Sequence, residues 1–186
     1  MSIKINNYKS GYQVVSLALD ESTKEDLQKE HVQLLFINNG RVVMYPENIE
    51  LDMEEKSSRY LENQNNYDVY EIWSDGRMFL RYDNASIDNH FFVTGKCNSN
   101  CIMCPSADSS RKYGDVTNVE HLIEVAKHIP SDAKHLTVTG GEPFLSGEEI
   151  FKFILFLREK FIETEFLFLT NGRIFALEKY ANLLKE

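Results

Sequence analysis

Short apolar runs separated by turn signals dominate the N-terminal part of the chain. Residues 32–37 and 41–45 are rich in β-branched and aromatic side chains and flank an Asn-Asn-Gly segment, and residues 69–73 and 77–82 flank Ser-Asp-Gly in the same way. Each pair predicts a β-hairpin, because Asn-Gly and Asp-Gly favour the positive φ angles of a tight turn. Residues 47–66, between the hairpins, are polar and charge-rich and predict a loop or a solvated helix.

From residue 90 onward, strand-like and helical patterns alternate along the chain. Residues 91–93, 136–138 and 166–169 are short and almost continuously apolar, which is typical of parallel strands that are covered on both faces. Segments with apolar side chains at helical spacing lie between the first and second strands, between the second and third strands, and after the third strand. This alternation predicts an α/β layer with a parallel sheet.

Helix start signals mark the segments between and after these strands. Thr117 and Glu120 fit a capping box, and Pro130 ends the helix that they open. Ser146 and Glu149 open the next helix in the same way. A third helix is predicted near the end of the chain, with its inward-facing positions at Phe175, Leu177, Ala181 and Leu184.

The two patterns divide the 186-residue chain into two predicted domains. Residues 1–88 are expected to form a small β-rich N-terminal module, and residues 89–186 to contain three βα units of a parallel α/β fold. Functional groups of such folds gather at the carboxyl ends of the strands. Three distinctive motifs follow the three predicted strands, and they are therefore candidates for one shared site.

Composition and charge exclude several kinds of partner. The chain carries 29 acidic residues against 20 Lys and Arg, so its formal net charge of −9 repels phosphate backbones and anionic lipid surfaces. No apolar run approaches the roughly 18 to 20 residues of a membrane span, and the N-terminus lacks the apolar core of a signal peptide. We therefore expect a cytoplasmic protein that binds neither nucleic acid nor membranes.

All three cysteines of the chain, Cys97, Cys101 and Cys104, lie within one short segment after the first predicted strand. They do not suit a disulfide framework, because such close neighbours rarely bridge and one thiol would be left over. Three thiolates on one loop can bind three irons of a cubane cluster and leave the fourth iron open. The alternative is a Cys3His zinc site with His90, although zinc loops usually arrange their cysteines in two separate pairs.

Two glycine-containing motifs follow the other strands. Gly140, Gly141, Glu142 and Pro143 come directly after the second strand, where two glycines let the backbone approach a ligand closely. The same segment could instead be a tight turn from strand to helix. Asn171 lies in the Thr-Asn-Gly segment after the third strand, and there a simple turn and a ligand contact remain equally open. Basic residues at positions 111 and 112 suit a solvated loop or an anion contact.

The CX3CX2C spacing of the cysteines resembles that of the radical S-adenosylmethionine (SAM) superfamily, and residues 89–186 are similar to the first half of its barrel-like core. The resemblance implies a [4Fe–4S] cluster on the three cysteines and SAM on the open iron. Reductive cleavage of SAM would then give a 5′-deoxyadenosyl radical. The cofactors would carry this chemistry, so no catalytic side chain is assigned.

The same resemblance implies roles for several other residues. Gly140, Gly141, Glu142, Pro143 and Asn171 are expected to contact SAM. Met103 replaces the aromatic residue that the superfamily usually has before the third cysteine, and we expect its apolar side chain to cover the cluster edge.

Residues 89–105, together with the β-rich module, resemble the radical SAM peptide maturases of the His-Xaa-Ser system. This resemblance implies a precursor peptide as a partner, and an electron donor such as flavodoxin or ferredoxin. The superfamily core has six βα units and three are predicted here, so a fragment, a split protein and a complete chain all remain open, as does activity of this chain alone. The alternative function is that of a truncated or non-catalytic iron–sulfur or electron-transfer module.

Overall fold

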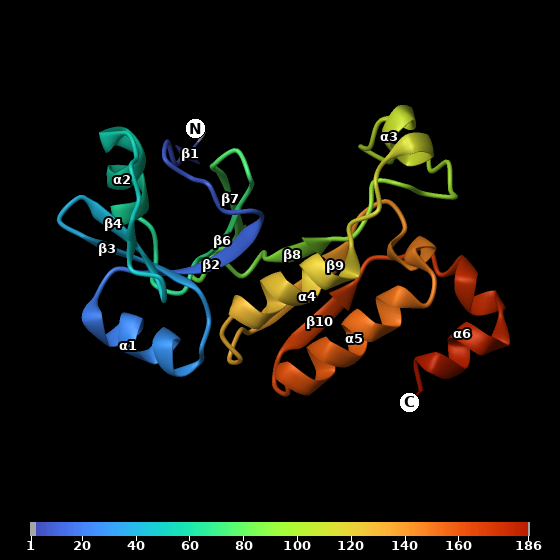
Figure 1. The fold of residues 1–186 in the computed structure, drawn as a ribbon. Helices are drawn as coiled ribbons and strands as arrows, with labels where there is room; N and C mark the ends of the chain where they lie inside the picture. Colours follow the sequence, from blue (N-terminus) through green and yellow to red (C-terminus); the bar gives the residue numbers. More distant parts are fainter. Residues whose placement is uncertain (1–2, 186) are drawn as a thin grey trace. The chain divides into compact units, whose positions relative to one another are not determined.

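The computed structural model of the chain describes residues 3–185 and separates into two compact units (Figure 1). The first unit contains residues 3–89 and 124–133, and the second contains residues 90–123 and 134–185. The second half of helix α4 (Val119–His128) therefore belongs to the first unit. The predicted domain boundary after residue 88 stays a prediction.

A seven-stranded sheet with the order β1-β7-β6-β2-β3-β4-β5 forms the frame of the first unit. Its strands are β1 (Ile3–Lys4), β2 (Gln13–Ala18), β3 (Leu34–Asn38), β4 (Arg41–Tyr45), β5 (Ile49–Glu50), β6 (Val69–Ile72) and β7 (Arg77–Tyr82). The neighbours pair antiparallel, except that β2 and β3 pair parallel. Helix α1 (Glu21–Lys29) connects these two strands, and α2 (Glu55–Glu62) lies within the predicted polar segment.

Both predicted hairpins are confirmed. Strands β3 and β4 pair around Asn39 and Gly40, whose φ angles are 52° and 77°, and β6 and β7 pair around Gly76 at 81°. The pattern-based prediction missed β2 and α1. The signal for them was present, because an apolar run at residues 14–19 precedes Asp20, which caps α1 by accepting a hydrogen bond from the backbone N–H of Thr23 at 2.8 Å.

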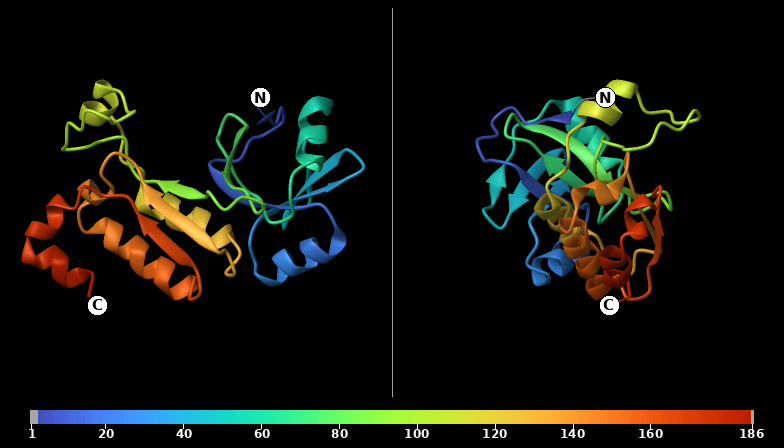
Figure 2. Two further views of the ribbon diagram at one scale, coloured as in Figure 1. Left: turned by 180° about the vertical axis from the view of Figure 1, so that it is seen from behind. Right: turned by 90° about the vertical axis from the view of Figure 1, so that its right-hand side faces the viewer.

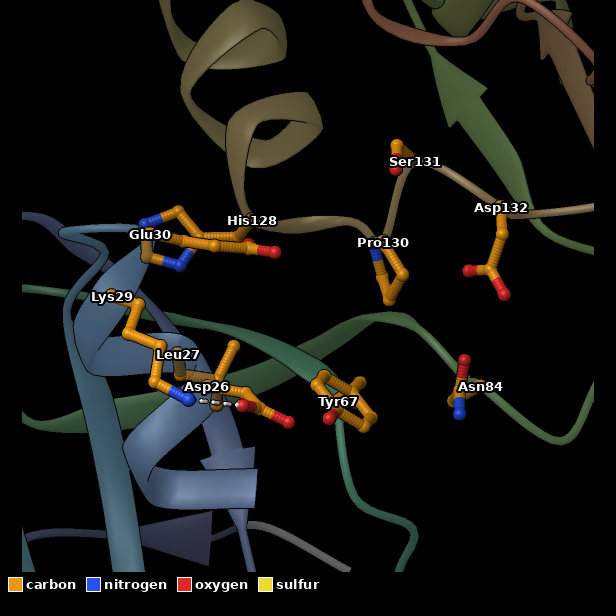
Figure 3. A pocket seen from close by; sticks show the side chains of 10 residues that line it. All are labelled: Asp26, Leu27, Lys29, Glu30, Tyr67, Asn84, His128, Pro130, Ser131 and Asp132. Carbon is orange, nitrogen blue, oxygen red and sulfur yellow. Dashed lines mark hydrogen bonds and ion pairs between the residues drawn. The ribbon is translucent and has the colours of Figure 1, made fainter. Parts of the chain in front are cut away.

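The core of the first unit lies where its central strands meet. Leu17, Leu35, Tyr70 and Ile72 are fully buried there. A buried polar contact holds residues 124–133 in the same unit, because the Ser16 hydroxyl lies 3.0 Å from Nδ1 of the His128 ring. A pocket of about 470 Å³ lies beside this ring in the first unit (Figure 3). It is lined by Asp26, Leu27, Lys29, Glu30, Tyr67, Asn84, His128, Pro130, Ser131 and Asp132.

A three-stranded parallel sheet with the order β10-β9-β8 forms the frame of the second unit. The strands are β8 (His90–Phe92), β9 (His135–Thr139) and β10 (Glu165–Phe168). The helical elements are α3 (Asp108–Tyr113), the start of α4, η1 (Pro143–Ser146), α5 (Glu149–Lys160), η2 (Arg173–Ala176) and α6 (Glu178–Leu183). The mixed α/β prediction is confirmed for this part, and the number of complete βα units stays a prediction.

Helix α5 lies along one face of the parallel sheet, and the other face is visible from behind (Figures 1 and 2). Phe91 on the covered face packs edge-on against Phe153 of α5, with 4.9 Å between ring centroids. On the other side of the strands Phe92 and Leu167 are about half exposed. Among the described residues, β10 pairs only with β9, so its outer edge is open. No helix within residues 3–185 has the length and apolar character that crossing a membrane requires.

Three details of the helix predictions were wrong. The cap of α4 is Asn118 and not Thr117, since the Asn118 side chain accepts from the backbone N–H of Glu120 at 2.9 Å. Ser146 does not open α5; it ends η1. The last helical segment is packed inward only in part: Phe175 packs edge-on against Phe144, with 4.8 Å between ring centroids, whereas Leu177 and Leu184 are 59% and 45% exposed.

Candidate functional site

The three sequence motifs come together at one edge of the parallel sheet. The cysteine loop follows β8, residues 140–143 follow β9, and residues 170–172 follow β10. The register pairs Phe92 with Thr139 and Phe168 with Val138, so the carboxyl ends of the three strands are level. Parallel, adjacent strands therefore bring the motifs together as the sequence predicted.

The cysteine loop begins on a narrow stem. The hydroxyl of buried Thr94 donates to the backbone carbonyl of Asp115 at 2.9 Å and accepts from the N–H of Lys96 at 3.0 Å. One residue later, the N–H of Cys97 donates to the carbonyl of Arg111 at 3.0 Å. The outgoing and returning chains thus hold each other at the base of the loop, which fixes where Cys97 starts.

The glycine turn after β9 pairs with this stem through its backbone. The N–H of Gly141 donates to the carbonyl of Thr94 at 2.6 Å, and the N–H of Glu142 to that of Lys96 at 2.8 Å. A Cβ on Gly140 would lie 2.5 Å from the Thr94 carbonyl oxygen, and one on Gly141 would overlap the Lys96 carbonyl. These glycines are therefore required because the turn comes close to the chain's own backbone at residues 94–96. Their contact with SAM stays a prediction.

The carboxylate of Glu142 connects the ends of β9 and β10. Its side chain is only 3% exposed, and it accepts from the N–H of Phe144 at 3.1 Å, the hydroxyl of Thr170 at 2.8 Å and the N–H of Asn171 at 2.6 Å. Three donors compensate for the burial of the charged group. Pro143 opens η1 directly after it and is buried as well.

Asn171 reaches from the end of β10 to the cysteine loop. Its side-chain amide donates to Oδ1 of Asn98 at 2.8 Å and to the hydroxyl of Ser99 at 3.2 Å. The guanidinium of Arg173 donates to the backbone carbonyl of Asn98 at 2.7 Å. These bonds hold the part of the loop between Cys97 and the next cysteine. The sequence patterns did not single out Arg173, because nothing local marks a contact across 75 residues.

The three thiols are free, since none forms a disulfide. Cys101 is exposed, and Cys97 and Cys104 are half-buried. The pKa of the Cys104 thiol is lowered, mainly by hydrogen bonding from the backbone of Ser106. The guanidinium of Arg111 makes the next largest contribution. Among residues 3–185, no three Cys, His, Asp or Glu side chains are gathered closely enough to hold a metal ion.

The donor groups of this loop nevertheless suit an iron–sulfur cluster. Three free thiols on one loop are the ligand set that leaves one iron of a cubane open. Buried next to them is an N–H of Arg111, Nε, that has no hydrogen-bond partner among the described residues and could donate to sulfur. His90 is the first residue of β8, whereas the cysteines follow the last residue of this strand. A Cys3His zinc site with His90 therefore gains no support. Met103 is 89% exposed, and its covering role stays a prediction.

Comparison with known proteins identifies the family. Residues 91–186, slightly more than half of the chain, match the family model described as the radical SAM superfamily. The chain belongs to the radical SAM superfamily. Its members typically bind a [4Fe–4S] cluster and SAM. The match covers the parallel sheet and all three motifs that meet at its carboxyl edge.

One curated relative of this radical SAM chain comes from Methanocaldococcus jannaschii and is provisionally named a glycyl-radical enzyme activating enzyme. The two sequences are 40% identical over 80 residues, which are 39% of this chain and 20% of the relative. The aligned part therefore spans about a fifth of the relative's length. No solved structure matches the chain.

The glycine turn predicts a steric effect on the radical SAM site. Gly141→Ala should lower the free energy of unfolding by about 1–3 kcal/mol, because its methyl group must displace the backbone of Lys96. Urea unfolding followed by circular dichroism measures this change. Gly11→Ala is the control, since a Cβ there meets no atom within 4 Å and its φ lies outside the positive region that favours glycine. Equal losses in the two variants would contradict the close approach.

Glu142 predicts a second effect on stability. Glu142→Ala should lower the free energy of unfolding by at least about 2 kcal/mol, because it leaves three donors without their acceptor. Thermal and urea unfolding measure the change. Glu163→Ala, at an exposed position before β10, should change it by less than about 0.5 kcal/mol. If Glu142→Ala behaves like Glu163→Ala, the carboxylate does not hold the two strand ends together.

Proposed function

We propose that the protein is a radical SAM enzyme that holds a [4Fe–4S] cluster on Cys97, Cys101 and Cys104 and cleaves SAM reductively to a 5′-deoxyadenosyl radical. One observation carries this proposal. The cysteine loop, the glycine turn and the Thr-Asn-Gly segment form one hydrogen-bonded set, through Glu142 and Asn171. Separate turns with only local roles would not need bonds from one motif to the next.

The protein groups have binding and positioning roles in this proposal. The bound cluster and SAM supply the electron transfer and the radical chemistry. We propose that Gly140, Gly141, Glu142, Pro143 and Asn171 form the SAM side of the site. Glu142 directly follows the two glycines and its carboxylate accepts from the N–H of Asn171, so it keeps the glycine turn and Asn171 at a fixed separation. Such preorganisation favours one bound orientation of the reacting groups.

We propose a polypeptide as the substrate. Support comes from the resemblance of residues 89–105 to peptide maturases, and from the archaeal relative, whose name assigns it the activation of an enzyme, which is itself a polypeptide. The finer assignment to the His-Xaa-Ser system stays a prediction. Residues 1–88 contain none of the proposed cluster or SAM ligands, so their proposed role is to recognise the peptide or a partner.

An electron donor such as flavodoxin or ferredoxin completes the proposal. Ile102 and Met103, at the tip of the cysteine loop, are fully and 89% exposed, respectively. Exposed apolar side chains beside the cluster ligands suit transient contact with a small redox protein. The net charge of −9 favours a donor that docks through such apolar contacts rather than through acidic side chains alone.

Cluster binding is the first test of this function. Protein reconstituted without air should hold about four irons and four sulfides per chain, because the three thiolates and one open iron suit a cubane. Iron, sulfide and zinc analysis measures the content. Cys101→Ala should lose the stable cluster, whereas Ser109→Ala, in helix α3 shortly after the loop, should keep it. Stoichiometric zinc in protein purified without air would contradict the cluster.

SAM chemistry is the second test. Adding SAM should change the electron paramagnetic resonance spectrum of the reduced cluster, because SAM occupies the open iron in the proposed site. 5′-Deoxyadenosine should then form in wild-type protein with reductant and not in Cys101→Ala, as chromatography of the same samples would show. A stable cluster whose spectrum does not respond to SAM would favour an iron–sulfur module without SAM chemistry.

A further inference from the structure

Arg111 in α3 contacts both ends of the cysteine segment. Its backbone carbonyl accepts from the N–H of Cys97 at 3.0 Å. Its guanidinium forms an ion pair with Asp108 at 2.6 Å and lies close enough to the Cys104 thiol to lower the pKa of that thiol, after the larger effect of the Ser106 backbone. One residue outside the CX3CX2C motif thus bonds to the first of the proposed cluster ligands and acts electrostatically on the third.

The burial of Arg111 is unusual for a basic residue on a short helix. Its side chain is only 14% exposed, although arginine is almost never buried without partners. The ion pair with Asp108 uses one terminal nitrogen, and Nε is buried without a hydrogen-bond partner among residues 3–185. A buried N–H that finds no acceptor is costly, by about 1–3 kcal/mol. The position therefore suits an acceptor on the side of the thiols.

A purely structural salt bridge would not explain this arrangement. Lys112, the next residue, pairs with the same carboxylate of Asp108 at 2.9 Å and remains 58% exposed. If the charge of Asp108 alone required a partner, an exposed side chain like that of Lys112 would satisfy it. Arg111 instead buries most of its side chain, although its planar group carries five N–H donors.

We propose that Arg111 is a positioning residue of the cluster site, which donates hydrogen bonds to the Cys104 sulfur and to cluster sulfur and so stabilises the reduced cluster. This inference rests on the proposed function. The cluster gains one negative charge when it passes from the 2+ to the 1+ state by taking up one electron from a reductant. Hydrogen bonds to the sulfurs and a nearby positive charge favour the more negative state and raise the reduction potential. Arg111 would therefore make the cluster easier to reduce and would slow the release of the cluster from the protein.

The test compares Arg111→Met with Lys112→Met in cluster-loaded protein. The two changes remove one positive charge from neighbouring residues, and both leave the backbone bond to Cys97 intact. The reduction potential is measured by titration with dithionite, followed by electron paramagnetic resonance, and cluster retention by the rate of iron transfer to a chelator. Arg111→Met should shift the potential to more negative values and release iron about tenfold faster. Lys112→Met should stay close to the wild type in both.

Equal shifts in the two variants would overturn the proposal, because they would show only a general effect of charge. If Arg111→Met takes up no iron, Arg111→Lys replaces it, since it keeps the charge and loses the planar donor group. A lowered potential in Arg111→Lys supports the proposal, and a wild-type potential overturns it. Wild-type protein that binds no cluster at all would refute the proposed function itself. If the wild type binds a cluster, and Arg111→Met has the same reduction potential and the same rate of iron release, only the role of Arg111 is refuted.

Discussion

The close backbone approach between residues 94–96 and 140–142 is the constraint on which the site depends. Two hydrogen bonds, from the N–H groups of Gly141 and Glu142, continue the pairing of β8 and β9 beyond the ends of these strands. Only glycine permits this approach, because a side chain at either glycine would overlap the carbonyl groups opposite. The cysteine loop therefore starts from a stem whose position is set by the neighbouring strand.

A buried carboxylate extends this constraint to the third strand. Glu142 is placed by the glycine turn, and its oxygens draw the hydroxyl of Thr170 and the N–H of Asn171 toward it. Asn171 then binds the cysteine loop at Asn98, which closes the set. The Glu142 carboxylate is buried and would otherwise lack donors, whereas the bond between Asn171 and Asn98 lies at the surface.

The cysteine loop combines a fixed base with an exposed tip. Its start is held by Arg111 and Asn171, whereas Ile102 and Met103 project into solvent. Loops on a rigid scaffold commonly carry function in this way, since the scaffold sets the position and the tip remains accessible. In the proposed function, this division would let the ligand set accept a cluster and admit both SAM and an electron donor.

The sequence alone determined the features that depend on local conformation. The turns at Asn39-Gly40 and Gly76 predicted the hairpins, because positive φ angles are a property of single residues. The apolar runs predicted the parallel strands, and their carboxyl ends placed the three motifs together; the cysteine spacing indicated the superfamily that the comparison then showed. Only the tertiary structure decided which groups each motif binds. That Glu142 bonds to residues 28 and 29 positions away, and that the Arg111 carbonyl accepts from the N–H of Cys97, depends on which segments pack together. No local pattern encodes such partners.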